Sequence, residues 1–213
     1  MTMKDEGILL VVSGPSGAGK GTICSALRQA YPDIHYSVSM TTRAPRSGEK
    51  EGISYYFRKE TEFRELIQRN AFLEYAQVYD HFYGTPKKYV LDQVARGKTV
   101  LLEIDIQGAM QVKKTYPKGV FIYIVPPSLQ ILSQRIHDRG TDSEEVIQKR
   151  LSQITRELAL AHQYDYIIVN DVLEQAVRKT SAILEAERCK LSRNEGQIET
   201  IFKQYITKEV SSK

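Results

Sequence analysis

The stretch that decides the fold is residues 14–22, which read Gly14-Pro15-Ser16-Gly17-Ala18-Gly19-Lys20-Gly21-Thr22. An apolar run from Gly7 to Ser13 precedes it and predicts a buried strand, and apolar residues at helical spacing follow it up to Pro32. Glycines let backbone N–H groups converge on phosphate oxygens, and the helix that follows turns its positive end toward the same anion. Lys20 adds a charge for the β and γ oxygens of a nucleotide. The sequence therefore predicts a nucleotide phosphate loop between a strand and a helix.

The loop departs from the usual pattern G-x-x-x-x-G-K-[ST] at one position, because Gly21 stands where Ser or Thr is expected. The next hydroxyl belongs to Thr22. Coordination of Mg²⁺ by a hydroxyl at the first position is therefore not predicted, whereas the backbone cradle is unaffected. We expect Mg²⁺ to enter with ATP and to be held mainly by phosphates and water, with Thr22 as a candidate protein ligand.

The rest of the chain predicts an α/β fold. Three further apolar runs predict strands buried on both faces of a sheet, and each is followed by a helical stretch (Thr99 to Ile106, Val120 to Val125 and Tyr166 to Val169). This alternation is typical of a parallel sheet flanked by helices, as in P-loop NTPases. Residues 34–88, rich in Tyr, Arg and Gly, predict an inserted lobe with its own small mixed sheet.

Residues 126–160 predict a helical lid. Ser128 is expected to cap its first helix, which carries Leu129, Leu132 and Ile136 on one face, and a second helix is expected to begin near Ser143. The tail, residues 188–213, predicts a helical extension with an apolar stripe at helical spacing: Ile198, Ile201, Phe202, Tyr205 and Ile206. Two interpretations of that stripe stay open, docking on the chain's own body or a contact in a homo-oligomer.

Composition limits the class of protein. The chain has 213 residues, 41% hydrophobic and 26% charged, which is typical of one globular domain, and its net charge of +4 is too small to indicate nucleic-acid binding. The early apolar run is too short to span a membrane, and the start lacks the layout of a signal peptide. The histidines show no metal-ligand spacing. We expect Cys24 and Cys189 to be reduced thiols in a cytoplasmic protein.

A second anion site is predicted in the inserted lobe. Arg43 and Arg46 could clamp one phosphate by forked hydrogen bonds, and Tyr55 and Tyr83 could add phenolic donors. A GTPase would need an Asn-Lys-x-Asp segment to bind its base, and no Asn in this chain is followed by Lys. A phosphate loop combined with a second anion site favours a small kinase.

The lobe then resembles the GMP-binding region of guanylate kinases, and later segments match the same family in order over residues 7–187. The matching segments are Ser37-Val38-Ser39-Met40-Thr41-Thr42-Arg43-Ala44-Pro45-Arg46-Ser47-Gly48-Glu49, Phe72 to Ala76, Tyr83 to Thr85, Leu102 to Gly108, Pro126 to Ser128, Arg135 to Thr141, Lys149 to Leu151 and Val169 to Asp171. The resemblance implies ATP-dependent phosphorylation of GMP, and of dGMP, in purine nucleotide metabolism. Met40 and Glu103 depart from the residues frequent in the family.

The resemblance also implies a role for each matching residue. The GMP phosphate would be held by Arg43, Arg46, Tyr55 and Tyr83. The guanine would face Ser39, Glu74 and Thr85, and Asp105 would lie near the base or near the waters of Mg²⁺, as a possible metal ligand. Asn170 would lie near the ATP nucleoside, and the ATP phosphates would meet three arginines of the lid, Arg135, Arg139 and Arg150. The residues expected to act on the transferring phosphate are Lys20, Arg43, Arg135, Arg139 and Arg150.

The chemistry of guanine supports Glu74 independently of any family. Guanine presents N1–H and the N2 amine side by side, and one carboxylate can accept from both, whereas adenine would leave that carboxylate unpaired at a cost of about 1–3 kcal/mol. Two rival functions stay open: a catalytically inactive domain that binds protein, and a P-loop kinase for another acceptor such as AMP or a small metabolite. The intact Gly19-Lys20 pair argues against the first rival.

Overall fold

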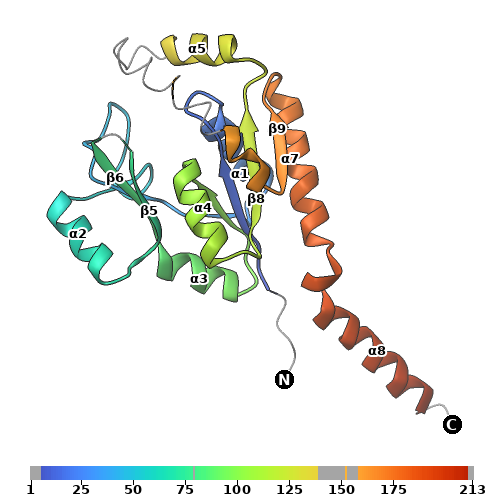
Figure 1. Ribbon diagram of the computed structural model, residues 1–213. Helices are drawn as coiled ribbons and strands as arrows, with labels where there is room; N and C mark the ends of the chain where they lie inside the picture. The colour runs from blue at the N-terminus through green and yellow to red at the C-terminus, as the bar shows by residue number, and fades with distance from the viewer. Residues whose placement is uncertain (1–5, 79, 139–151, 153–157, 211–213) are drawn as a thin grey trace.

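Two sheets organise the chain, and the computed structural model describes residues 6–78, 80–138, 152 and 158–210 (Figure 1). The larger sheet is parallel throughout, and its five strands lie in the order β2 (His35–Tyr36), β7 (Val100–Glu103), β1 (Leu9–Ser13), β8 (Val120–Val125) and β9 (Tyr166–Val169). This confirms the α/β fold with a parallel sheet that the sequence predicts.

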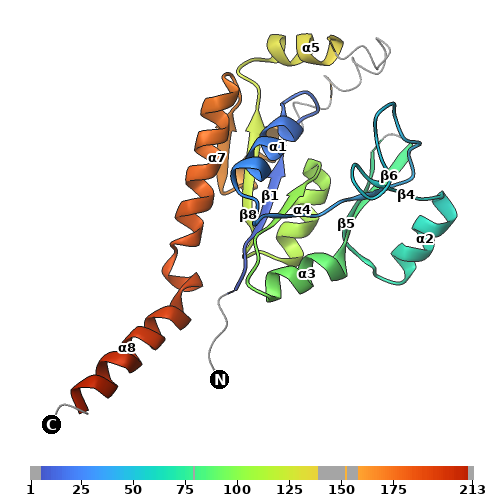
Figure 2. The same cartoon turned by 180° about the vertical axis from the view of Figure 1, so that it is seen from behind.

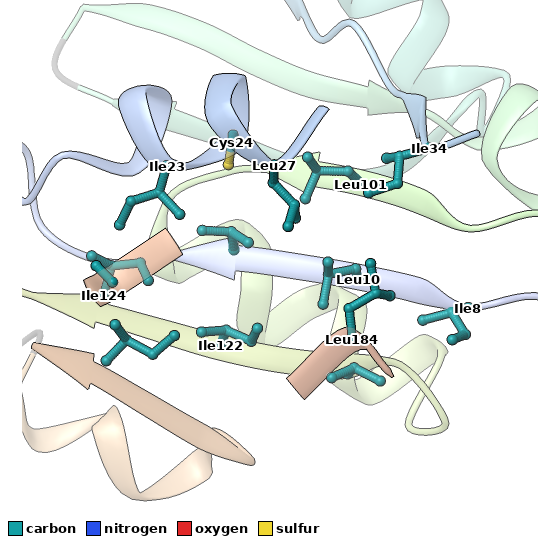
Figure 3. Close-up of a cluster of buried hydrophobic side chains, with 14 of the residues drawn as sticks. Ile8, Leu10, Ile23, Cys24, Leu27, Ile34, Leu101, Ile122, Ile124 and Leu184 are labelled. Carbon is teal, nitrogen blue, oxygen red and sulfur yellow. The ribbon is translucent and has the colours of Figure 1, made fainter. Parts of the chain in front are cut away.

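Helices cover both faces of the larger sheet, with α1 (Lys20–Ala30) and α7 (Leu173–Arg188) on one face and α3 (Lys87–Ala95) and α4 (Ile106–Thr115) on the other (Figures 1 and 2). Side chains of a strand alternate between its two faces. Leu10 of β1 accordingly packs in the core beneath α1 and α7, which Figure 3 shows, and Leu9 packs in the core beneath α3 and α4.

The second sheet forms the predicted lobe and is mixed. Its strands lie in the order β4 (Tyr56–Phe57), β3 (Met40–Thr41), β6 (His81–Pro86) and β5 (Phe72–Val78). The β3–β4 pair is parallel, and the β3–β6 and β5–β6 pairs are antiparallel. Helix α2 (Glu60–Gln68) covers this sheet through Phe63, whose ring stacks 4.5 Å from that of Phe72. Strand β2, although inside residues 34–88, pairs with β7 in the larger sheet.

Helix α5 (Leu129–His137) begins where the sequence predicts the lid. The Ser128 hydroxyl caps it by accepting a hydrogen bond from the Ile131 N–H at 3.1 Å. Leu132 and Ile136 are buried, whereas Leu129 is 56% exposed. Leu129 is the first residue of the helix and lies before the first buried turn. The second lid helix, predicted to begin near Ser143, lies outside the described residues up to position 157, apart from position 152.

Strand β9 is less buried than the sequence predicts. Ile168 is buried, but Ile167 is 62% exposed and Val169 46% exposed, so burial on both faces is wrong for this strand. The reason is its position, because β9 is the edge strand of the larger sheet, and among the described strands only β8 pairs with it. A short turn of 3₁₀-helix, Ala161–Gln163, precedes it.

Helix α8 (Glu195–Val210) follows the 3₁₀ turn Leu191–Arg193 and extends away from the body of the molecule in both views (Figures 1 and 2). Ile201 and Phe202 of the apolar stripe are exposed, so this part of the stripe does not dock on the body. Among the helices that the structure describes, none has the length and apolarity needed to cross a membrane. Cys24 and Cys189 are both free thiols.

Candidate active site

The phosphate loop joins β1 to α1 and folds around the ammonium group of Lys20. Lys20 Nζ donates to the carbonyl oxygens of Gly14 at 2.6 Å and Pro15 at 3.1 Å. Gly19 is the N-cap of α1 and has a φ of +90°, a conformation that glycine adopts without strain. A Cβ at Gly19 would also overlap the amide nitrogen of Asn170. Both features require glycine at the loop's last turn, as the sequence pattern predicts.

Asn170 follows β9 and lies buried against the phosphate loop. Its side-chain Nδ2 donates to the carbonyl oxygen of Ala18 at 2.8 Å, and its backbone N–H donates to Val125 at 2.8 Å. The Asn170 carbonyl accepts from Nη1 of Arg135 at 3.0 Å. Asn170 therefore connects the phosphate loop, the end of β8 and helix α5, and its predicted nearness to the ATP nucleoside stays a prediction.

Two carboxylates lie at the carboxyl end of β7, Glu103 as its last residue and Asp105 two residues later. A Cβ added to Gly21 would lie 3.3 Å from Oε1 of Glu103, which places that carboxylate beside the first turn of α1. Asp105 caps α4 by accepting from the Gly108 N–H at 2.7 Å. Burial raises the pKa of Asp105, while the Gly108 N–H and the charge of Lys20 act in the opposite direction. Thr22 is exposed in the same turn of α1 as Gly21.

These donors fit a magnesium ion that is held mainly by a nucleotide. In the described part of the chain, no three His, Cys, Asp or Glu side chains lie close enough to form a metal cage. Mg²⁺ binds hard oxygen donors and in nucleotide sites takes one or two carboxylates together with phosphates and water. The Glu103 carboxylate beside the phosphate loop supplies such a donor where the sequence has no hydroxyl at position 21.

An arginine and two tyrosines come together in the lobe. Arg43 Nε donates to the phenolic oxygen of Tyr83 at 3.2 Å, and its guanidinium carbon lies 5.6 Å from the ring centroid of Tyr55. The Tyr55 and Tyr83 rings meet edge to face at 5.9 Å. Arg46 is exposed and joins this cluster through its backbone N–H. The structure thus brings together three of the four residues predicted to hold the acceptor phosphate.

Glu49 completes this cluster, and sequence reasoning missed its role. Its carboxylate accepts from Nη2 of Arg43 at 2.8 and 3.0 Å and from the Arg46 N–H at 2.7 Å. Although partial burial acts in the opposite direction, these donors hold the pKa of Glu49 below its ordinary value. Glu49 lies three positions after Arg46, which is the spacing of a tight turn. That spacing was the available signal.

Glu74 is a buried carboxylate on β5. It is 5% exposed and accepts from the hydroxyl of Thr85 at 2.6 Å. Burial raises the pKa of Glu74 to about 7; the Thr85 hydroxyl and N–H lower it, and the charge of Asp105 raises it further. The β5–β6 register shifts between Phe72 and Glu74, a feature that re-aims side chains. Burial of an ionisable group with one hydroxyl partner is typical of a binding site.

The Arg43 cluster and Glu74 lie along one face of the lobe sheet. Tyr83 and Thr85 are two residues apart on β6 and therefore point to the same side, and Glu74 is the direct partner of Thr85 on β5. Burial, and then the neighbouring Tyr83, raise the pKa of Tyr55 to about 12, and the charge of Glu103 in the core adds to this rise. The charges of the core and of the lobe are therefore close enough to interact.

Three predicted residues are not placed at either site by side-chain contacts. Ser39 lies between β2 and β3, where its carbonyl accepts from the Tyr56 N–H at 2.9 Å. Arg139 and Arg150 lie outside the described residues. Their roles stay predictions.

Comparisons with known proteins agree with this arrangement. The family model described as guanylate kinase matches residues 6–187. The chain is 52% identical over 194 residues to the guanylate kinase of Caldanaerobacter subterraneus subsp. tengcongensis, covering 91% of this chain and 94% of that protein. It is 54% identical over 188 residues to that of Carboxydothermus hydrogenoformans, covering 88% and 92%. The crystal structure of guanylate kinase from Anaplasma phagocytophilum superposes with a TM-score of 0.76 at 37% identity, over 89% of this chain and 90% of that one. The chain belongs to the guanylate kinase family.

Proposed function

We propose that this chain transfers the terminal phosphate of ATP to GMP, giving ADP and GDP, and that dGMP also serves as an acceptor. Membership of the guanylate kinase family supports the activity. The observation that carries the choice of acceptor is the buried Glu74, which shares one face of the lobe sheet with the Arg43 cluster. A carboxylate at one end and an arginine with two phenols at the other match a purine with two adjacent N–H donors and a phosphate.

The acceptor is held at both of its ends. Arg43, Arg46, Tyr55 and Tyr83 bind the GMP phosphate, and Glu49 keeps the Arg43 guanidinium oriented before the phosphate arrives. Glu74 accepts from guanine N1–H and from the N2 amine, and the Thr85 hydroxyl donates a hydrogen bond to the same carboxylate. Ser39 and Asp105 contribute further contacts to the base.

The donor is held by the phosphate loop. Backbone N–H groups of residues 14–22 cradle the ATP phosphates, and the ammonium of Lys20 turns from the loop carbonyls to the β and γ oxygens. Asn170 fixes the loop through Ala18 and lies toward the ATP nucleoside. When bound with ATP, Mg²⁺ supplies positive charge that neutralises the β and γ oxygens. Glu103, with Thr22 or Asp105, would hold it directly or through water.

Transfer needs no protein nucleophile. An oxygen of the GMP phosphate attacks the γ-phosphorus in line, and the bond to the ADP oxygen breaks. Lys20 and Arg43 stabilise the charge that spreads over the transferring group, and Arg135, Arg139 and Arg150 do so from the lid. Closure of the lid and the lobe excludes water, which would otherwise accept the phosphate. We assign the reaction to the cytoplasm, where thiols such as Cys24 and Cys189 stay reduced.

A panel of acceptors tests the proposal. GMP, dGMP, AMP, UMP and IMP are compared at fixed ATP and Mg²⁺ by coupling ADP formation to NADH oxidation. We expect the highest kcat/KM with GMP, a lower value with IMP, which lacks the N2 amine, and the lowest values with AMP and UMP. ADP formation that favours AMP would support the rival kinase, and absence of ADP formation with every acceptor would support the rival binding module.

A further inference from the structure

One polar side chain of α4 pairs with the backbone of β5, the strand that carries Glu74. Strand β5 lies at the edge of the lobe sheet, so one side of its backbone has no neighbouring strand. The amide of Gln111 fills that place. Its Nε2 donates to the carbonyl oxygen of Tyr75 at 2.7 Å, and its Oε1 accepts from the Tyr75 N–H at 3.2 Å. A single side chain thus pairs with both backbone groups of the residue next to Glu74.

Gly108 lies one turn before Gln111 on the same face of α4. A Cβ at position 108 would overlap Oε2 of Glu74 and would lie 2.9 Å from its Cδ. The backbone of Gly108 therefore forms one wall of the space that the Glu74 carboxylate occupies. Gly108 also donates its N–H to Asp105, which brings the second carboxylate to the same turn of the helix.

We propose that Gly108 and Gln111 are positioning residues for the guanine base: Gln111 fixes β5 against α4, and Gly108 leaves the space in which the Glu74 carboxylate faces the base. This inference rests on the proposed function, because it assumes that Glu74 contacts guanine. Neither residue touches the substrate. Each acts through Glu74, so each should alter the discrimination between purines that present two N–H donors and purines that present one.

Gln111→Met tests the clamp, because methionine keeps the length of the side chain and removes both hydrogen bonds. The matched control is Gln77→Met, at an exposed position of strand β5. Two lost hydrogen bonds to backbone should raise the KM for GMP by about tenfold. The ratio of kcat/KM for GMP to that for IMP should fall by about threefold or more, while the KM for ATP stays unchanged. Gln77→Met should leave all three values as they are.

Gly108→Ala tests the wall. Alanine is more favourable than glycine within a helix, and the nearest atoms in its way belong to the end of the Glu74 side chain. The midpoint of thermal unfolding should therefore stay unchanged. The KM for GMP should rise by about tenfold or more, and the ratio of kcat/KM for GMP to that for IMP should fall. A KM for GMP that is unchanged in both variants would overturn the inference. An equal loss with GMP and IMP, accompanied by a lower unfolding midpoint, would also overturn it.

Glu74→Gln separates this inference from the proposed function. Glu74→Gln should lower the ratio of kcat/KM for GMP to that for IMP. If it does so and neither Gln111→Met nor Gly108→Ala does, the positioning roles are wrong and the proposed base contact stands. If Glu74→Gln leaves the ratio unchanged, the base contact itself is wrong, and the inference is overturned with it.

Discussion

Binding of GMP should release a proton from Glu74 near neutral pH. Burial raises the pKa of this carboxyl to about 7 in the absence of substrate, while the ordinary value is 4.5. Thr85 and Asp105 are the groups whose hydrogen bonds and charge act on it. Guanine offers two N–H donors, and only the ionised carboxylate can accept from both. The acceptor therefore selects the ionised form, and its apparent affinity should rise with pH until the carboxyl is fully ionised.

The magnitude follows from the pKa. With a pKa of about 7, about one tenth of the free protein is ionised at pH 6 and about nine tenths at pH 8. The KM for GMP should then be about tenfold higher at pH 6 than at pH 8. The second ionisation of the GMP phosphate, with a pKa of about 6, adds its own smaller dependence.

The assay compares wild type with Glu74→Gln, which cannot titrate at this position. The KM for GMP is measured from pH 6 to pH 8 at saturating ATP, and the wild-type profile is divided by that of the variant, so that the phosphate's contribution cancels. The quotient of the two KM values should fall by about tenfold from pH 6 to pH 8. The kcat/KM of the variant should be lower than that of wild type by on the order of a hundredfold. A quotient that is flat over this range would refute the reasoning, because Glu74 would then not titrate on binding GMP.

The same pKa affects stability with the opposite sign. Between pH 4.5 and about 7 the folded protein keeps a proton on Glu74 that the unfolded chain has lost. Stability of the substrate-free protein should therefore fall as pH rises through this window, by about 3 kcal/mol at most. Chemical unfolding of wild type and Glu74→Gln at pH 5 and pH 8 checks this, since the variant should lose less stability over the same interval.

Three further predictions concern other parts of the molecule. Arg43→Lys loses the forked donor that reaches Tyr83, so the KM for GMP should rise by about tenfold with the KM for ATP unchanged; steady-state kinetics with each nucleotide varied would show the split. Asn170→Ala removes the donor to Ala18 and should raise the KM for ATP severalfold, an idea that an unchanged KM would contradict. Glu187→Ala leaves Arg193 and Lys190 without their buried partner and should lower the free energy of unfolding by about 3 kcal/mol, with kcat unchanged, as measured by urea unfolding and by turnover.

Features that depend on neighbours in the sequence were predictable. The phosphate loop follows from glycine spacing between an apolar strand and an amphipathic helix, and β1 and α1 form where that pattern lies. Ser128 caps α5 because a hydroxyl at that position can reach an N–H three residues on. The Arg43 cluster was predictable for a different reason, since its residues match the order of a known family.

Features that depend on the order of strands in space were not predictable. The apolar run of β9 has the composition of a central strand, yet it lies at the edge and exposes Ile167. Gln111 has no signal in the sequence, because its partner Tyr75 is far away in the chain and offers only its backbone. An amide that pairs with an open strand edge can be recognised only when the edge is known.

The segment after β7 connects the two nucleotide sites. Because β7 lies next to β1 in a parallel sheet, its carboxyl end reaches the phosphate loop, and Glu103 meets Gly21 there. Two residues later Asp105 caps α4, and that helix carries the contacts to Glu74 and β5. The proposed donor and acceptor contacts therefore depend on one short, continuous segment. Gln111, further along α4, contacts the lobe strand β5, so its substitution should change the constants for GMP before those for ATP.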